Sequence, residues 1–159
     1  GPRAELIRNG TVWTDVEHNR EQMIKHCPKV DFYVSATLSV FNHLHVVDFY
    51  NDWIAKGLIT HQDWNMNVVQ DPEHYRADIL PQHMKDNVTQ LYQQHITEIE
   101  PKDHLGRATN GFKSAIKFIN GTDNTKLIPQ FKKFVDLIDK RRNQKTIDVF
   151  PELKDLLNE

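Results

Sequence analysis

Residues 30–42, VDFYVSATLSVFN, alternate in a way that is typical of a β-strand with two different faces, because side chains along a strand point to opposite sides in turn. One face carries the apolar residues Val30, Phe32, Val34, Ala36, Leu38 and Val40. The other carries Asp31, Tyr33, Ser35, Thr37 and Ser39. The apolar face requires a helix or a sheet to cover it, whereas the row of small hydroxyls faces either solvent or a ligand.

The neighbouring segments predict a repeated helix–strand alternation. Residues 11–28 and 44–57 have apolar residues at helical spacing, with Thr11 as a capping residue at the start of the first. Residues 63–72 form a second two-faced strand, with Asn65 and Asn67 opposite an apolar side. Helix, strand, helix and strand in this order predict an α/β fold with parallel strands.

The polar face of each strand limits the kind of sheet that fits. In an ordinary doubly wound sheet helices cover both faces, so the strands are apolar on both sides. A strand with one polar face fits a barrel or half-barrel whose interior holds a ligand. It also fits the edge of a sheet with one wet face, and the residues by themselves leave both alternatives open.

The second half of the chain is predicted to be helical. Residues 81–99, 109–121 and 128–144 each carry an apolar stripe, and a short segment around Phe150 follows. At 159 residues and 38% hydrophobic residues, the chain is long enough for one core. We therefore expect a single domain over residues 1–159, with a β/α part at 11–80 and a helical part at 81–159. The three tryptophans lie on apolar faces and are expected in the core.

Composition excludes several classes of function. Twenty basic and 22 acidic residues give a formal charge of −2, which argues against a nucleic-acid partner. No apolar stretch approaches 18 residues, so we expect a soluble, cytoplasmic protein with no membrane partner. The chain has nine histidines but no zinc-ligand spacing, and no metal site is expected. Cys27 is the single cysteine and is expected to be packed.

Four segments together carry a family resemblance: AELIRNGTVWTDVEHN, SATLSVFNHLHVVDFYNDWIAKGLI, NVVQDPEHYRADILP and LIDKRRNQKTIDVFPEL. They resemble the C-terminal half of radical SAM proteins of the twitch-domain class, many of which come from bacteria and phages. The similarity runs from about Arg3 to the end of the chain. It implies a partial barrel of parallel strands, of which this chain supplies the fourth helix, the fifth and sixth strands and the C-terminal helices.

The resemblance also implies two cofactors, a [4Fe-4S] cluster and S-adenosylmethionine bound across the strand tips. The CxxxCxxC motif that holds the cluster has no counterpart in this sequence, and one cysteine cannot hold a cluster. We therefore expect a cluster only in a complete protein, and no radical SAM activity from these residues alone. The alternative is a standalone, non-catalytic α/β module that binds itself or another protein.

The resemblance gives the polar strand residues an expected role in cofactor binding. The residues that would line the barrel interior beside the adenosine part of S-adenosylmethionine are Ser35, Thr37, Ser39, Asn65 and Asn67. Asn42 and Gln70 lie at the strand ends, where ligands collect in parallel α/β folds. Hydrogen bonds among these residues, or to water, are the alternative that remains open.

A strand that begins a cut sheet has an unpaired edge. The segment 30–42 is rich in β-branched and aromatic residues and has no proline. We therefore expect a homo-oligomer joined near residues 30–42, or pairing with the missing N-terminal half. Val34→Pro is expected to disrupt an oligomer of this kind.

Overall fold

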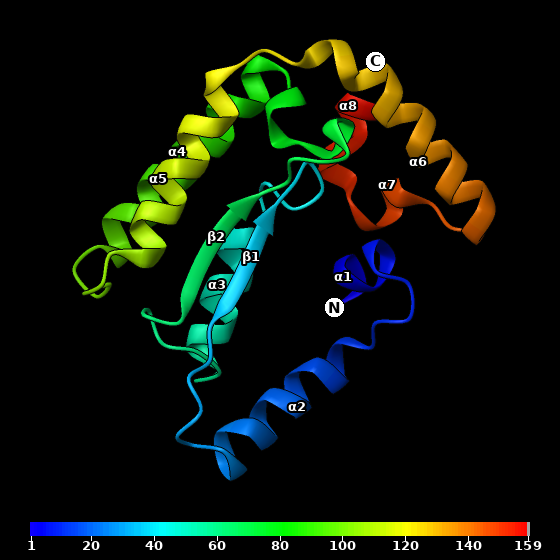
Figure 1. The fold of residues 1–159 in the computed structure, drawn as a ribbon. Coiled ribbons are helices and arrows are strands. Elements are labelled where there is room, and N and C mark those ends of the chain that lie inside the picture. Colours follow the sequence, from blue (N-terminus) through cyan, green and yellow to red (C-terminus); the bar gives the residue numbers. More distant parts are fainter. Residues whose placement is uncertain (159) are drawn as a thin grey trace. The chain divides into compact units, whose positions relative to one another are not determined.

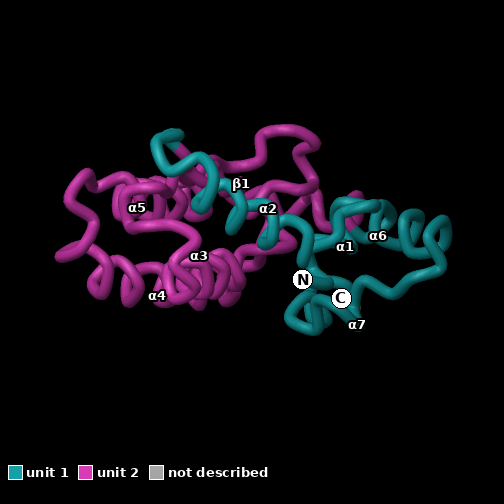
Figure 2. The backbone as a smooth tube through the Cα atoms, turned by 90° about the horizontal axis from the view of Figure 1, so that it is seen from below, with its two compact units in different colours: residues 1–31, 132–159 teal, residues 32–131 magenta. Residues whose placement is uncertain are grey.

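The computed structural model describes residues 1–158 and has a mixed α/β fold, mostly helical, with a two-stranded parallel sheet (Figure 1). Two compact units are present (Figure 2). The terminal unit contains residues 1–31 and 132–159, and the central unit contains residues 32–131. The boundary expected near residue 80 lies inside the central unit. No helix in the described part of the chain is long and apolar enough to cross a membrane.

The central unit is built on a parallel β–α–β motif, as the alternation predicted. Strand β1 (Val34–Leu38), helix α3 (Val46–Ala55) and strand β2 (Trp64–Val68) follow one another along the chain. The strands pair in register from Val34 opposite Trp64 to Leu38 opposite Val68. The first strand is shorter than predicted, because pairing begins where the Val34 N–H donates to the Asp63 carbonyl at 2.7 Å.

Helix α3 covers the apolar side of the sheet with aromatic side chains. Tyr50 and Trp53 are buried, and the Tyr50 ring meets the ring of Trp64 on β2 edge to face at 5.0 Å. The helix stops where predicted, because Gly57 adopts a φ of +68°, in the left-handed region that glycine enters at little cost.

Two 3₁₀ turns and two long helices complete most of the central unit. The turns span Glu73–Tyr75 and Ala77–Ile79, and the helices are α4 (Gln82–Ile99) and α5 (Arg107–Gly121). Helix α5 packs against both α4 and β2 (Figure 1). A third 3₁₀ turn, Thr125–Leu127, leads into α6 (Ile128–Arg142), which continues into the terminal unit.

The terminal unit joins the two ends of the chain. Its remaining elements are α1 (Pro2–Ile7), α2 (Trp13–His26), α7 (Thr146–Val149), a 3₁₀ turn (Pro151–Leu153) and α8 (Lys154–Asn158). The Arg3 guanidinium lies over the Phe150 ring, 5.0 Å from its centroid, and forms an ion pair with Glu152. Arg142 donates to the Leu6 carbonyl at 2.7 Å. These contacts hold α1 beside the C-terminal segments.

Helix α2 differs from its prediction in packing and in capping. None of its residues is buried, and Trp13 is half-buried rather than in the core. Its apolar stripe is broken where Asn19 and Arg20 occupy the middle turn. The predicted threonine cap is wrong, because the Trp13 N–H instead donates to Glu5 Oε1 at 2.9 Å.

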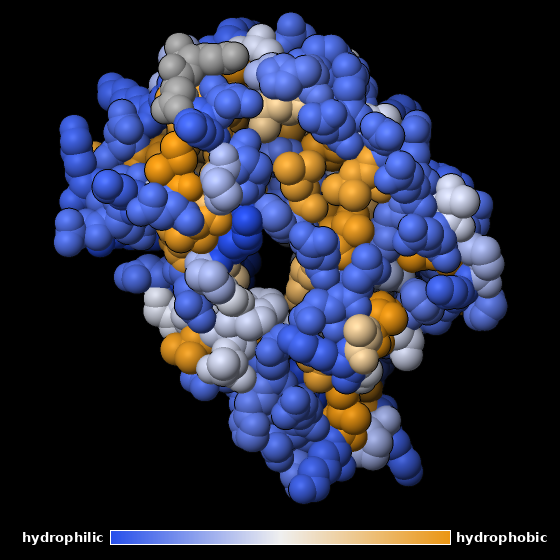
Figure 3. All heavy atoms as spheres, turned by 180° about the vertical axis from the view of Figure 1, so that it is seen from behind, coloured by the Kyte–Doolittle hydropathy of each residue, from blue (hydrophilic) through white to orange (hydrophobic). Residues whose placement is uncertain are grey.

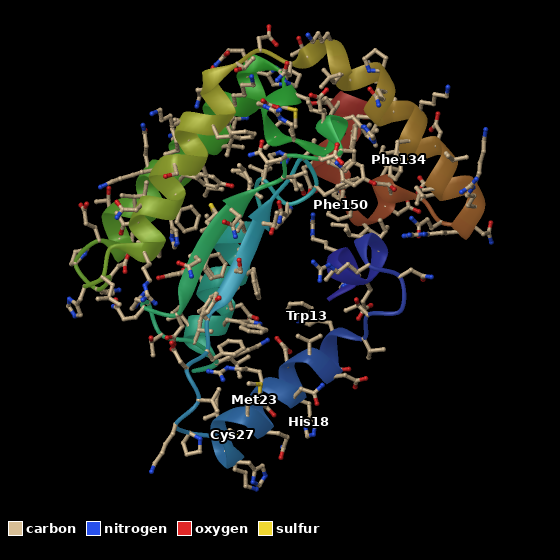
Figure 4. The ribbon with its side chains drawn as sticks, in the orientation of Figure 1. Trp13, His18, Met23, Cys27, Phe134 and Phe150 are labelled. Carbon is tan, nitrogen blue, oxygen red and sulfur yellow. The ribbon has the colours of Figure 1, made fainter. Side chains whose placement is uncertain are left out.

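Several apolar side chains of this segment therefore remain at the surface. Figure 4 shows Met23 and Cys27 near the C-terminal end of α2. Met23 is 36% exposed, and Cys27 is exposed rather than packed as predicted. The face seen in Figure 3 is mostly hydrophilic, with hydrophobic residues in separate patches.

Candidate functional site

The register of the two strands gathers polar side chains on one face of the sheet. Ser35 pairs with Asn65, and Thr37 pairs with Asn67. Asn65 is half-buried and the other three are exposed, whereas Ala36 and Leu38 on the opposite face are buried. Asn67 Nδ2 donates to Ser35 Oγ at 2.7 Å. We call Ser35, Thr37, Asn65 and Asn67 the polar face.

Ser39 and Asn42 have a different environment from the polar face. The Ser39 N–H donates to Asn42 Oδ1 at 2.7 Å, and the Ser39 hydroxyl donates to the same oxygen at 3.3 Å. Asn42 Nδ2 donates to the Thr37 carbonyl at 3.0 Å. Both side chains thus hold the turn that follows β1, and their polar atoms are already engaged there. Gln70 is exposed, two residues beyond the end of β2.

A second set of side chains with polar atoms lies inside the central unit, where aromatic rings contact one another. Five rings contact one another in sequence-distant pairs: Tyr50, Trp64, Tyr92, His95 and Phe112. We call these residues the aromatic cluster. The sequence pointed to Tyr92 on the apolar stripe of α4 but not to His95, although three-residue spacing from Tyr92 places a side chain on the same helical face.

A hydrogen bond connects the aromatic cluster to a half-buried histidine. The Tyr50 hydroxyl lies 2.7 Å from His61 Nδ1. Burial, with a smaller effect of Asp103, raises the pKa of Tyr50 well above its ordinary value. Burial and the charge of Lys102 lower the pKa of His61. Both groups are therefore neutral, and Tyr50 keeps its proton and can donate a hydrogen bond to His61 Nδ1.

His95 and Asp103 are buried with polar atoms that are not satisfied. His95 is 2% exposed, and neither ring nitrogen has a hydrogen-bond partner among residues 1–158. Asp103 Oδ2 accepts from the Thr109 N–H at 2.8 Å near the start of α5, but its Oδ1 has no partner within the same range. Most buried polar atoms in proteins are paired, so these atoms mark the least favourable part of this core.

The burial of His95 predicts that the protein loses stability in mild acid. Burial lowers the pKa of His95, against opposing influence from Glu98. Below about pH 6.5 the unfolded chain binds a proton that the folded chain does not, so the free energy of unfolding falls as pH decreases. The loss is at most about 1.4 kcal/mol per pH unit for one proton and ends below the folded pKa.

Urea unfolding of the wild type and of His95→Phe between pH 7.5 and 5 measures this effect. The phenylalanine keeps the ring contacts with Tyr50 and Phe112 and removes the titrating group. We expect a shallower pH slope in His95→Phe. His83 is exposed on the same helix, so His83→Gln is the matched control. An equal slope in the wild type and His95→Phe would contradict the assignment.

Two further histidines of the central unit have structural roles. His43 is buried, with Nδ1 2.6 Å from the Val40 carbonyl, and His45 pairs with Asp48 at 3.0 Å. The chain turns after Asp71 through the 3₁₀ turn at Glu73–Tyr75. Within residues 1–158, no three or more histidine, cysteine, aspartate and glutamate side chains converge as a metal site would require.

Comparisons with protein-family models, with curated proteins and with solved structures gave no match.

Proposed function

We propose that the polar face is the adenosine side of an S-adenosylmethionine site, in a chain that supplies the last two strands of a partial radical SAM barrel. The observation that carries this proposal is the contrast between the two faces of the sheet. Ala36 and Leu38 are buried on one face, and Ser35 and Thr37 are exposed on the other. A parallel sheet that keeps one polar face suits a barrel interior that receives a ligand.

The chemistry of the polar face suits a nucleoside. A serine or threonine hydroxyl donates one hydrogen bond and accepts others, and an asparagine amide offers two donors and an acceptor. Ribose hydroxyls and the adenine edge need this mixture. Thr37 and Asn67 lie toward the carboxyl ends of the strands, where ligands bind in open parallel sheets. These two residues are therefore assigned the principal contacts.

The residues of this chain do not fit an iron–sulfur cluster. Such a cluster takes several cysteine thiolates, and the sequence contains only Cys27. Cys27 is exposed after the end of α2, in the terminal unit, whereas the polar face belongs to the central unit. We therefore assign no radical step to these residues. In the proposal, a cluster is held by residues outside this sequence.

Titration with adenosine tests the proposal and avoids the charged part of S-adenosylmethionine. We expect a dissociation constant on the order of 0.1 to 1 mM, because the polar face provides only one side of a site. Thr37→Val removes one hydrogen-bonding group and is expected to weaken binding about fivefold. Thr97→Val, the same change at an exposed position of α4, is the control. Equal affinity in both variants would refute the role of Thr37.

The edge of β1 favours a second function, that of a module that associates with itself. The Val34 N–H and the Leu38 carbonyl both bond toward β2, at 2.7 and 2.9 Å. Because main-chain groups alternate in direction along a strand, those of Ser35 and Thr37 point to the other edge. Asn42 already occupies the Thr37 carbonyl.

This geometry changes the expected proline experiment. Val34→Pro would break the pairing with β2, since the Val34 N–H does not face the open edge. Proline is tolerated where the N–H faces away from the sheet, so Ser35→Pro is the appropriate substitution. The translational diffusion of the protein, measured on the samples of the adenosine titration, also shows whether the chain is a monomer or a dimer. Two results together would favour the self-associating module. The wild type would form a dimer that Ser35→Pro dissociates, and the wild type would not bind adenosine.

A further inference from the structure

A cavity on the surface of the central unit is open to solvent and shares no lining residue with the polar face. Its volume is about 340 Å³, at the small end of the range for ligand sites. One wall comes from Arg76 and Asp78, in the segment that follows β2. The α5 side is lined by Ser114, Lys117 and Phe118, with Gly121 and Thr122 at the end of the helix. All of these residues belong to the central unit.

Arg76 is held in a fixed position on this wall. Asp78 is 1% exposed and accepts from Arg76 Nε at 3.2 Å and from Nη2. Asn124 Nδ2 donates to Asp78 Oδ2 at 2.9 Å and so fixes the carboxylate in turn. The guanidinium also lies over the Phe118 ring, 5.1 Å from its centroid. Arg76 Nη1 bonds to no other residue among those described and keeps its donors for a ligand.

The helical wall adds further donors on a single face of α5. Ser114, Lys117 and Phe118 are three and four residues apart, so their side chains are neighbours on the helix surface. Ser114 and Lys117 are exposed, and Lys117 forms no ion pair with any residue in the described range. An ammonium group, a hydroxyl and a fixed guanidinium thus line one cavity beside an aromatic ring.

The acidic side chains in and beside the cavity each lie near a basic one, and Asp123, which follows the lining residue Thr122, interacts with Lys85. Both oxygens of Asp78 accept hydrogen bonds, and Arg76 balances its charge. The end of α5 would carry partial negative charge, but buried Lys85 donates to the Thr122 carbonyl there at 2.9 Å. The charge left over at the cavity is therefore positive and comes from Lys117.

We propose that this cavity binds a small organic anion in which a phosphate or carboxylate adjoins a flat apolar group. The anion takes the donors of Lys117, Ser114 and Arg76 Nη1, and the apolar group lies against Phe118. A guanidinium oriented by a carboxylate loses little freedom on binding, which favours anion recognition. This site is independent of the adenosine proposal and shares no residue with the polar face.

Phenyl phosphate is the first probe, followed through the amide signals of residues 114–121. We expect saturable shifts with a dissociation constant on the order of 1 mM. Lys117→Met is expected to weaken binding at least about fivefold. Lys113→Met is the matched control on the same helix, because Lys113 pairs with Glu100 at 2.9 Å and does not line the cavity. Equal affinities in these two variants would overturn the proposal.

Simpler probes separate the two parts of the ligand. Inorganic phosphate and phenol are each expected to bind about tenfold more weakly than phenyl phosphate, whereas benzoate distinguishes a carboxylate from a phosphate as the preferred anion. If inorganic phosphate binds as tightly as phenyl phosphate, the proposed apolar contact is overturned. If phenol binds as tightly as phenyl phosphate, the proposed anion contact is overturned. Adenosine affinity is expected to be unchanged in Lys117→Met, so the two proposals fail separately.

Discussion

Asp78→Ala is expected to lower the free energy of unfolding by about 3 kcal/mol, because removal of one member of a buried ion pair strands the other. Asp78 is 1% exposed and accepts hydrogen bonds from Arg76 and Asn124. Its loss leaves both donors without an acceptor in a segment that also joins β2 to α4. Chemical unfolding followed by circular dichroism measures the change.

Two further variants show whether the pair or the packing is responsible. Replacement of both partners by apolar residues, Arg76→Met with Asp78→Leu, is expected to cost less than Asp78→Ala alone, since no charge is then stranded. Glu100→Gln removes an exposed partner of Lys113 and is expected to cost at most about 1 kcal/mol. A loss below about 1 kcal/mol in Asp78→Ala would show that the carboxylate is not important for the fold.

Gly111→Leu is expected to cost about as much, because α5 packs on β2 without room for a side chain at that point. A Cβ at residue 111 would lie 2.9 Å from Met66 Cβ and 3.4 Å from the Met66 main-chain nitrogen. Neither atom can move without moving the strand. Overpacking of a core commonly costs about 1 to 3 kcal/mol, and leucine adds three carbons beyond the Cβ.

Gly111→Ala and Gly121→Ala form a matched pair on the same helix. Alanine is a better helix former than glycine by about 1 kcal/mol, so a helix without neighbours would gain from either change. The Cβ at residue 121 would meet no atom within 4 Å. Thermal unfolding is therefore expected to show a lower midpoint for Gly111→Ala and an unchanged or higher one for Gly121→Ala. A higher midpoint for both would contradict the close packing of α5 on β2.

The β–α–β motif could be predicted because its signals are local. Alternation with period two identified β1 and β2, helical spacing identified α3, and Gly57 marked the helix end. The polar face followed from the same alternation, since a parallel register brings Thr37 beside Asn67 without further information. The expected parallel α/β arrangement is confirmed at this level, whereas the half-barrel stays a proposal.

The rest of the candidate sites depends on contacts between distant segments. Arg76 and Asp78 look like solvated turn residues in the sequence, and only the return of the chain at Asn124 shows that the carboxylate is enclosed. Asn42 was predicted beside a ligand, but its short side chain reaches back to the Thr37 carbonyl. Such bonds between side chain and backbone compete with other roles and carry little periodic signal.

Helix α2 shows the opposite case: the helical spacing of its apolar residues predicts more burial than the structure has. Its apolar residues Val16, Met23 and Ile24 were expected on a covered stripe but are 36 to 40% exposed. Helical spacing identifies a helix from its own residues, whereas burial needs a partner surface. The sequence pattern contains the first kind of information and not the second.

The most direct test of the adenosine site is an isotope-filtered nuclear Overhauser measurement with labelled protein and unlabelled adenosine. The proposal predicts contacts between ribose or adenine protons and the Thr37 methyl group, with additional contacts to the Asn67 side-chain amide. The same sample should show none to the methyl group of Thr97, an exposed residue of α4 in the same central unit. Contacts confined to the α5 cavity, or no contacts at 10 mM adenosine, on the order of ten times the weakest expected dissociation constant, would contradict the assignment of the polar face.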